Sequence, residues 1–107
     1  MKMYILISTY TRPLDEVDAV LGDHIEWVTR HYREGRFLVS GRREPPVGGA
    51  IVMRARDRDE VDAVLATDPF QRAGLARYEV HEFGATDFPR RSPGFDAFAA
   101  GEPARVT

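Results

Sequence analysis

The chain has 107 residues, a formal net charge of −2 and no cysteine. This length fits one domain, the small charge argues against nucleic-acid binding driven by bulk charge, and the lack of cysteine excludes disulfides, a thiolate nucleophile and cysteine-ligated metal. Because no run approaches the ~18 apolar residues of a membrane helix and the short apolar start lacks the features of a signal peptide, we expect a cytoplasmic protein with no membrane partner.

The first predicted elements are a strand and a long helix. Residues 4–9 are rich in aromatic and β-branched side chains, which is typical of a strand. From Pro13 onward, apolar side chains recur every three or four residues, which predicts one amphipathic helix that ends at Gly35. The positions that form this apolar face are Leu14, Val17, Leu21, His24, Val28 and His31, with Val20 and Trp27 beside them.

The rest of the domain is predicted to contain three more strands and a second helix. The strands are expected at residues 37–40, 50–55 and 78–83. Asp57 or Asp59 is expected to cap the second helix, and Asp68 with Pro69 to open a short helical turn. The order β-α-β-β-α-β predicts an α+β, ferredoxin-like fold with an antiparallel sheet and both helices on one face.

Three of the predicted strands are apolar at every position of a three-residue run. An antiparallel sheet with helices on one face should carry polar side chains on its other face. The simplest cover for a second apolar face is the same sheet from another copy of the chain. We therefore predict a homodimer, from the runs Ile5-Leu6-Ile7, Phe37-Leu38-Val39 and Ile51-Val52-Met53.

Residues 85–107 are expected to form an irregular C-terminal arm, separate from a domain of residues 1–84. Prolines and glycines forbid a long regular element in this segment. Three phenylalanines, Phe88, Phe95 and Phe98, make the segment too apolar for a free tail. We expect these aromatic side chains to dock on the domain or on its partner.

His24 and Asp68 are the candidate catalytic residues. His24 lies on the apolar face of the first predicted helix, where it is either a core histidine held by one hydrogen bond or a general acid or base in a cleft. Asp68 precedes Pro69 and has the position of a helix N-cap. One carboxylate oxygen can cap while the other binds an imidazole. If the two residues meet, the carboxylate would orient the ring and raise its basicity.

Ser40 and Arg42 are the candidate substrate-binding residues. Ser40 precedes Gly41 at a strand end, where a ligand can approach the backbone; the alternative is an ordinary strand-end hydroxyl. Arg42 is either a solvated loop charge or part of a site for an anionic substrate. His31 is expected to have a structural role at the helix C-terminus, where the dipole favours a protonated ring.

The histidines give little support for a metal site. His24, His31 and His81 lack the tight spacing of a zinc motif such as His-Glu-x-x-His. Gly48-Gly49 precedes a strand rather than a helix, so the pair does not indicate a phosphate cradle. We expect neither a metal nor a cofactor.

Taken in order, several short motifs resemble the YCII-related (YciI-like) family of small bacterial proteins. The resemblance covers roughly residues 1–84 and leaves the arm outside it. The matching pieces are His24, Gly35-Arg36-Phe37-Leu38-Val39-Ser40-Gly41, Gly49-Ala50-Ile51-Val52, Asp68-Pro69-Phe70, Ala73-Gly74-Leu75 and Tyr78-Glu79-Val80-His81-Glu82-Phe83.

This resemblance implies a dimeric α/β barrel with a His–Asp pair in a pocket, here His24 and Asp68. Dehydrochlorination of chlorinated hydroxyquinols is associated with a relative, and muconolactone isomerases share the wider fold. Two hypotheses follow. The chain is either a cofactor-independent enzyme of lyase or isomerase type, acting by His–Asp acid–base chemistry on a small cyclic or aromatic acid, or a non-catalytic module that binds a small ligand.

Overall fold

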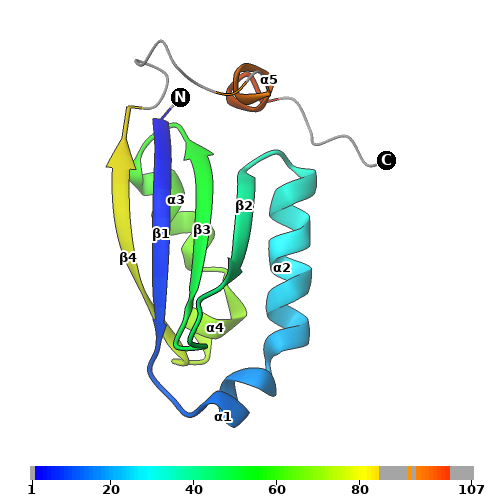
Figure 1. Ribbon diagram of the computed structural model, residues 1–107, viewed down its shortest axis with the longest axis vertical. Coiled ribbons are helices and arrows are strands. Elements are labelled where there is room, and N and C mark those ends of the chain that lie inside the picture. The colour runs from blue at the N-terminus through cyan, green and yellow to red at the C-terminus, as the bar shows by residue number, and fades with distance from the viewer. Residues whose placement is uncertain (1, 85–91, 93, 102–107) are drawn as a thin grey trace.

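A single four-stranded antiparallel sheet organises the chain (Figure 1). The computed structural model describes residues 2–84, 92 and 94–101. The sheet has the strand order β2-β3-β1-β4, which places the first and third strands at its centre and confirms the predicted ferredoxin-like α+β fold. The strands are β1 (Lys2–Tyr10), β2 (Phe37–Arg42), β3 (Gly49–Ala55) and β4 (Ala76–Phe83).

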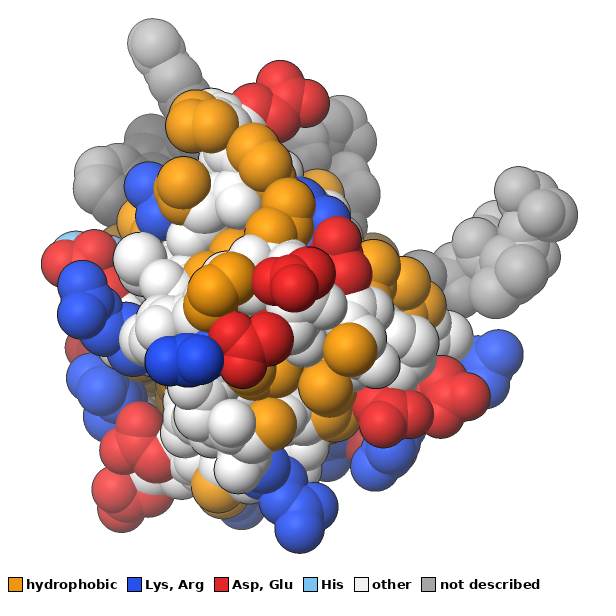
Figure 2. Space-filling model, turned by 90° about the horizontal axis from the view of Figure 1, so that it is seen from below, with side chains coloured by type: hydrophobic (Ala, Val, Ile, Leu, Met, Phe, Trp, Pro, Cys, Tyr) orange, Lys and Arg blue, Asp and Glu red, His pale blue; other side chains and the backbone are white. Residues whose placement is uncertain are grey.

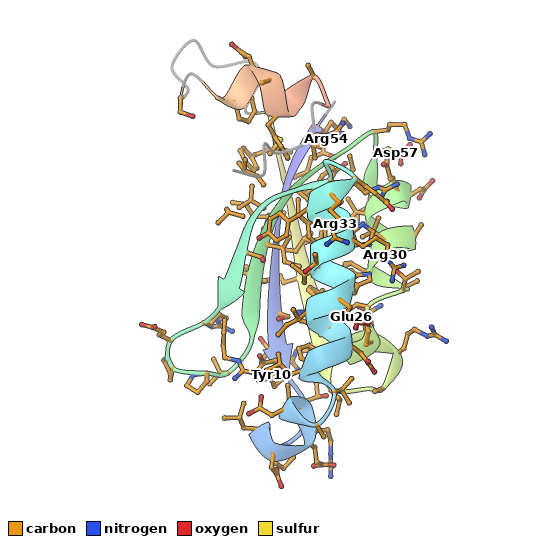
Figure 3. The ribbon with its side chains drawn as sticks, turned by 90° about the vertical axis from the view of Figure 1, so that its right-hand side faces the viewer. Tyr10, Glu26, Arg30, Arg33, Arg54 and Asp57 are labelled. Carbon is orange, nitrogen blue, oxygen red and sulfur yellow. The ribbon has the colours of Figure 1, made fainter. Side chains whose placement is uncertain are left out.

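The helices that follow β1 and β3 cover one face of the sheet, as the side view in Figure 3 shows. In this view Glu26, Arg30 and Arg33 lie along the outer side of α2, away from the sheet. The helices are α1 (Leu14–Asp18), α2 (Leu21–Arg33), α3 (Arg58–Leu65), α4 (Pro69–Arg72) and α5 (Phe95–Ala99). None of these described helices is long and apolar enough to cross a membrane.

The prediction of one continuous helix up to Gly35 is wrong, because the chain turns between α1 and α2. Val20 has a φ of −110° and a ψ of 2°, outside the helical range. The turn lets the fully buried Val17 of α1 pack in a small cluster with Phe70 and Leu75. The apolar spacing is that of a helix on both sides of the break, so periodicity alone gave no sign of it.

The main core lies between the covered face of the sheet and the helices α2 and α3. Strand alternation directs Tyr4 and Leu6 of β1 to this face, where both side chains are fully buried. Trp27 of α2 packs among them. The remaining buried members of this cluster are Phe37, Ile51, Met53, Ala55, Val61, Val64 and Leu65.

The opposite face of the sheet carries an apolar row, flanked by His81 and Glu79 of β4, and is only partly covered. Ile5 pairs with Val52, and Val52 pairs with Val39, so the three side chains form a row across three strands. Val39 remains 53% exposed, and Ile5 and Val52 are half-buried. None of the helices α1 to α4 covers this row, because α2, α3 and α4 lie on the other side of the sheet and α1 lies beyond its end (Figure 3).

The C-terminal segment contains one short helix, α5, where an irregular arm was predicted. Phe98 of α5 is buried, and the guanidinium of Arg54 lies 5.9 Å from the centre of its ring. Phe95 is half-buried, while Phe88 lies outside the described residues. The short helix thus contacts the end of the sheet near Arg54 (Figure 3).

Gly48 is required by the close approach of two backbones. A Cβ atom at this position would lie 1.8 Å from the backbone oxygen of Ser8, which no side-chain rearrangement can relieve. We predict that Gly48→Ala lowers the free energy of unfolding by about 2 kcal/mol or more, since overpacking here displaces backbone. Gly41→Ala is the matched control, because a Cβ atom there meets nothing within 4 Å. Equal stability of the two variants in urea denaturation would contradict this account.

Candidate active site

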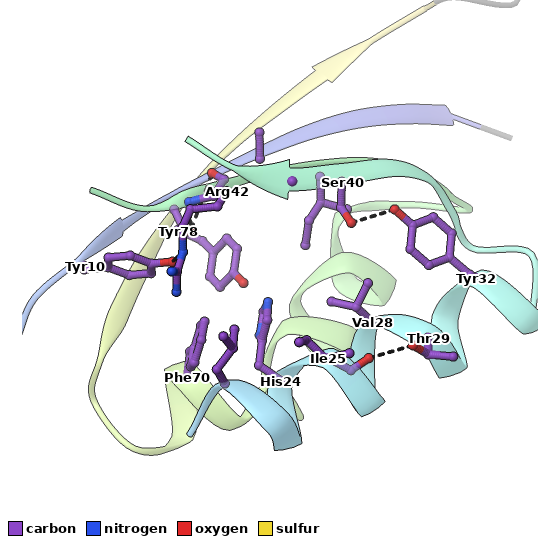
Figure 4. A pocket seen from close by; sticks show the side chains of 16 residues that line it. Tyr10, His24, Ile25, Val28, Thr29, Tyr32, Ser40, Arg42, Phe70 and Tyr78 are labelled. Carbon is purple, nitrogen blue, oxygen red and sulfur yellow. Dashed lines mark hydrogen bonds between the residues drawn. The ribbon is translucent and has the colours of Figure 1, made fainter. Parts of the chain in front are cut away.

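His24 lies at the wall of a cavity of about 400 Å³ between α2 and the sheet (Figure 4). The ring stacks on Phe70 of α4, with 4.0 Å between ring centres and 6° between planes, and also contacts Trp27. Only 17% of the His24 side chain is exposed. These contacts hold the imidazole plane in one orientation.

Asp68 is the N-cap of α4 and is fully buried. Its Oδ1 accepts hydrogen bonds from the backbone N–H of Phe70 at 3.0 Å and from His24 Nδ1 at 2.8 Å. Its Oδ2 accepts from the Tyr78 hydroxyl at 2.5 Å. Asp68 therefore has both of the roles considered in the sequence analysis: it caps α4 and it holds the imidazole of His24. The Phe70 N–H and the Tyr78 hydroxyl both donate to this carboxyl group, so Asp68 acts as a hydrogen-bond acceptor on both of its oxygens.

This arrangement determines which nitrogen of His24 is free. Because Asp68 acts as an acceptor, Nδ1 of a neutral His24 carries the proton and donates it to the carboxylate. The lone pair then resides on Nε2. Within the described part of the chain, no group hydrogen-bonds to Nε2. A neutral imidazole with this tautomer can accept a proton from a molecule in the cavity.

Tyr78 is a site residue that the sequence analysis did not identify. Burial, together with the charge and hydrogen bond of Asp68, raises the pKa of the Tyr78 hydroxyl above its ordinary value, which keeps the hydroxyl a donor. Its signal in the sequence is weak. Tyr78 stands at an inward-facing position of the last strand, ten residues after Asp68, but a tyrosine at such a position is common in any core.

The two predicted substrate-binding residues line the same cavity, and each is already bonded to a neighbour. Ser40 shares a hydrogen bond of 2.6 Å with the Tyr32 hydroxyl. Arg42 donates from Nε to the Tyr10 hydroxyl at 3.0 Å and from Nη2 to Asp18 at 2.6 Å. In Figure 4, Ser40 and Arg42 lie at opposite ends of the cavity, with His24 between them.

His31 corrects one expectation about the helix end. The ring is buried among Trp27 and Phe37 rather than exposed to the dipole as a cation. Burial, and then the charge of Arg36, lower the pKa of His31 to about 4, so the ring is neutral at neutral pH. No group of three or more metal-binding side chains is present among residues 2–84, 92 and 94–101.

Comparisons with known proteins agree with the fold predicted from the sequence. The family model described as "YCII-related domain" matches residues 1–84. A 5-chloro-2-hydroxyhydroquinone dehydrochlorinase from Burkholderia phenoliruptrix AC1100, solved in complex with 2,5-dihydroxybenzoquinone, has a similar fold: TM-score 0.67, 20% identity, covering 77% of this chain and 93% of that one. An antibiotic biosynthesis monooxygenase is also similar, with a TM-score of 0.52, 20% identity, and coverage of 78% and 97%. No curated protein matches the chain significantly.

The His24–Asp68 hydrogen bond predicts an unusual tautomer that NMR can detect. We expect long-range ¹H–¹⁵N spectra of the protein to show neutral His24 protonated on Nδ1, because Asp68 accepts that proton. In Asp68→Ala the acceptor is gone, and the proton should move to Nε2, the tautomer that imidazoles prefer in water. His81, an exposed histidine on β4, serves as the internal reference. An Nε2-protonated ring in both proteins would contradict the assignment.

Proposed function

This chain belongs to the YCII-related family, and we propose that its cavity is the active site of a cofactor-independent enzyme that moves protons on a small cyclic or aromatic acid. The observation that carries the proposal is the 2.8 Å hydrogen bond between His24 Nδ1 and the fully buried Asp68, at the wall of a cavity of about 400 Å³. The absence of cysteine fits the reducing cytoplasm as the compartment.

In the proposed reaction, His24 is the general base and then the general acid. Nε2 takes a proton from a carbon or hydroxyl group of the substrate, and the resulting imidazolium is stabilised by the Asp68 carboxylate. The electron pair of the broken C–H or O–H bond forms a new double bond. In an isomerisation the adjacent double bond shifts, and Nε2 returns the proton to a different atom. In an elimination a group on the neighbouring carbon leaves with the electron pair of its bond, and Nε2 then releases its proton to solvent.

The lining of the cavity favours a ring as substrate. Apolar side chains of Val28 and Ile51 line it between the polar groups at its two ends. Ser40 and Arg42 are the proposed contacts for substrate oxygens. The dehydrochlorinase of similar fold is an enzyme bound to a quinone ring, and dehydrochlorination is the removal of a proton and a chloride, which a single base can support.

One observation favours the alternative, a module that binds a ligand without converting it. The polar groups of the cavity largely bond one another, as in the pair formed by Tyr32 and Ser40. His24 also packs on Phe70 as a core side chain would. In such a module the imidazole would contribute packing and one hydrogen bond rather than a proton.

Replacement of His24 separates the two functions. We predict that His24→Asn and His24→Ala lower turnover by about 10²–10⁴-fold, the usual contribution of a general base, with the fold retained. The assay follows chloride release from chlorinated hydroquinones and the ultraviolet absorbance of small cyclic lactones. Glu26→Ala, on the outer side of α2 and outside the cavity, is the control. Unchanged turnover in a folded His24 variant would refute the catalytic role, and binding of 2,5-dihydroxybenzoquinone with no turnover of any compound in the wild-type protein would favour the module.

We further propose that the chain forms a homodimer through the open face of its sheet. The row of Ile5, Val52 and Val39 is apolar and lies on the face that α1 to α4 leave uncovered. Isologous packing of this row against its own copy would remove it from water.

A charge in the middle of this row should separate the subunits. We predict that Val52→Arg is a folded monomer under conditions in which the wild-type protein is a dimer, because pairing two sheets would bury two unpaired guanidinium groups. The molar mass from light scattering after size-exclusion chromatography gives the result. Leu14→Arg, at a 37% exposed apolar position on α1, is the control. A monomeric wild-type protein, or a dimeric Val52→Arg variant, would contradict the proposal.

A further inference from the structure

The charge of Arg42 is balanced by a residue outside the cavity. Arg42 lines the cavity, and its Nη2 atom donates to Asp18 Oδ1 at 2.6 Å. Asp18 belongs to α1 and is not among the residues that line the cavity. Both side chains are partly exposed, at 33% for Arg42 and 42% for Asp18. Arg42, the cation that we propose to bind the substrate, is thus already paired with a carboxylate of the protein itself, Asp18.

The guanidinium group of Arg42 has more N–H donors than its contacts in the described structure use. It carries five N–H bonds, and the described structure engages Nε with Tyr10 and Nη2 with Asp18. The Tyr10 ring also lies beneath the guanidinium, with 5.6 Å from Cζ to the ring centre. These contacts fix the group at one end of the cavity, beside Tyr10 (Figure 4). A ligand carboxylate can reach the remaining donors or replace Asp18.

Either way of binding brings a second negative charge close to Asp18. Carboxylates that share one guanidinium repel each other, and the repulsion is stronger at a partly buried site than in water. The end of the molecule that carries α1 shows acidic and basic side chains lying next to one another (Figure 2). Two ion pairs there join Arg42 with Asp18 and Arg12 with Glu16.

We propose that Asp18 is a specificity-determining residue that competes with a substrate carboxylate for Arg42. It lowers the affinity of this end of the cavity for anions in general, so a small free anion binds weakly there, and an acid whose ring also fills the cavity is favoured. The inference rests on the proposed function in one respect, that the ligand is a cyclic acid. It does not depend on proton transfer by His24.

Binding of two isosteric probes tests the proposal without any assay of turnover. The probes are 4-hydroxybenzoate and 4-hydroxybenzamide, which share size and shape and differ in charge. We expect Asp18→Asn to bind 4-hydroxybenzoate roughly three- to tenfold more tightly than the wild-type protein, the range expected for one nearby charge, and to bind 4-hydroxybenzamide unchanged. Isothermal titration calorimetry provides both dissociation constants. Because the ion pair is partly exposed, its loss should cost little stability.

Two further variants make the outcome specific. Asp23→Asn removes the same charge from the first turn of α2, away from the Arg42 contact, and should leave both affinities as in the wild-type protein. Arg42→Gln removes the cation that attracts the carboxylate. This variant should therefore bind 4-hydroxybenzoate no more tightly than 4-hydroxybenzamide. An unchanged affinity of Asp18→Asn for 4-hydroxybenzoate, including no detectable binding to either protein, would overturn the proposal. Loss of turnover in His24→Asn with the Asp18 effect intact would separate it from the catalytic mechanism.

Discussion

A buried carboxylate that must be surrounded by donors organises this site. Asp68 is fully buried, and an unpaired charge in that position would carry a large desolvation penalty. Its donors come from three elements: His24 on α2, the backbone of Phe70 on α4, and Tyr78 on β4. The hydrogen bonds to this one carboxylate therefore fix α2, α4 and β4 relative to one another. The free nitrogen of His24 is a consequence of that constraint.

Local signals in the sequence predicted the elements and marked His24 and Asp68 as candidates. That these two residues, 44 positions apart, meet was a hypothesis from the residues and was implied by the resemblance to the YCII-related family. Strand alternation, the Asp57 cap of α3 and the Asp68-Pro69 step each act within a few residues. The turn after α1 was missed because the apolar spacing continues through it. Tyr78 was missed because its role depends on a contact ten residues away in the chain, and no local pattern distinguishes it from an ordinary strand tyrosine.

The polar groups that line the cavity differ in whether they already have a hydrogen-bond partner within the protein. Tyr32 with Ser40, and Arg42 with Asp18, have their strongest bonds to one another. His24 differs, since Asp68 occupies one of its nitrogens and leaves the other facing the cavity. Chemistry is expected where a reactive atom lacks an internal partner and its orientation is fixed, and this comparison selects Nε2 over the hydroxyl and guanidinium groups.

The two surfaces for which we propose functions lie on opposite faces of the same sheet. Inward-facing positions such as Ser40 and Ile51 line the cavity, while the neighbouring positions Val39 and Val52 point to the open face. Pairing of two open faces would bury Val39 and Val52 and leave Ser40 and Ile51 on the opposite face of the same strands. Dimer formation and ligand binding would therefore use different side chains.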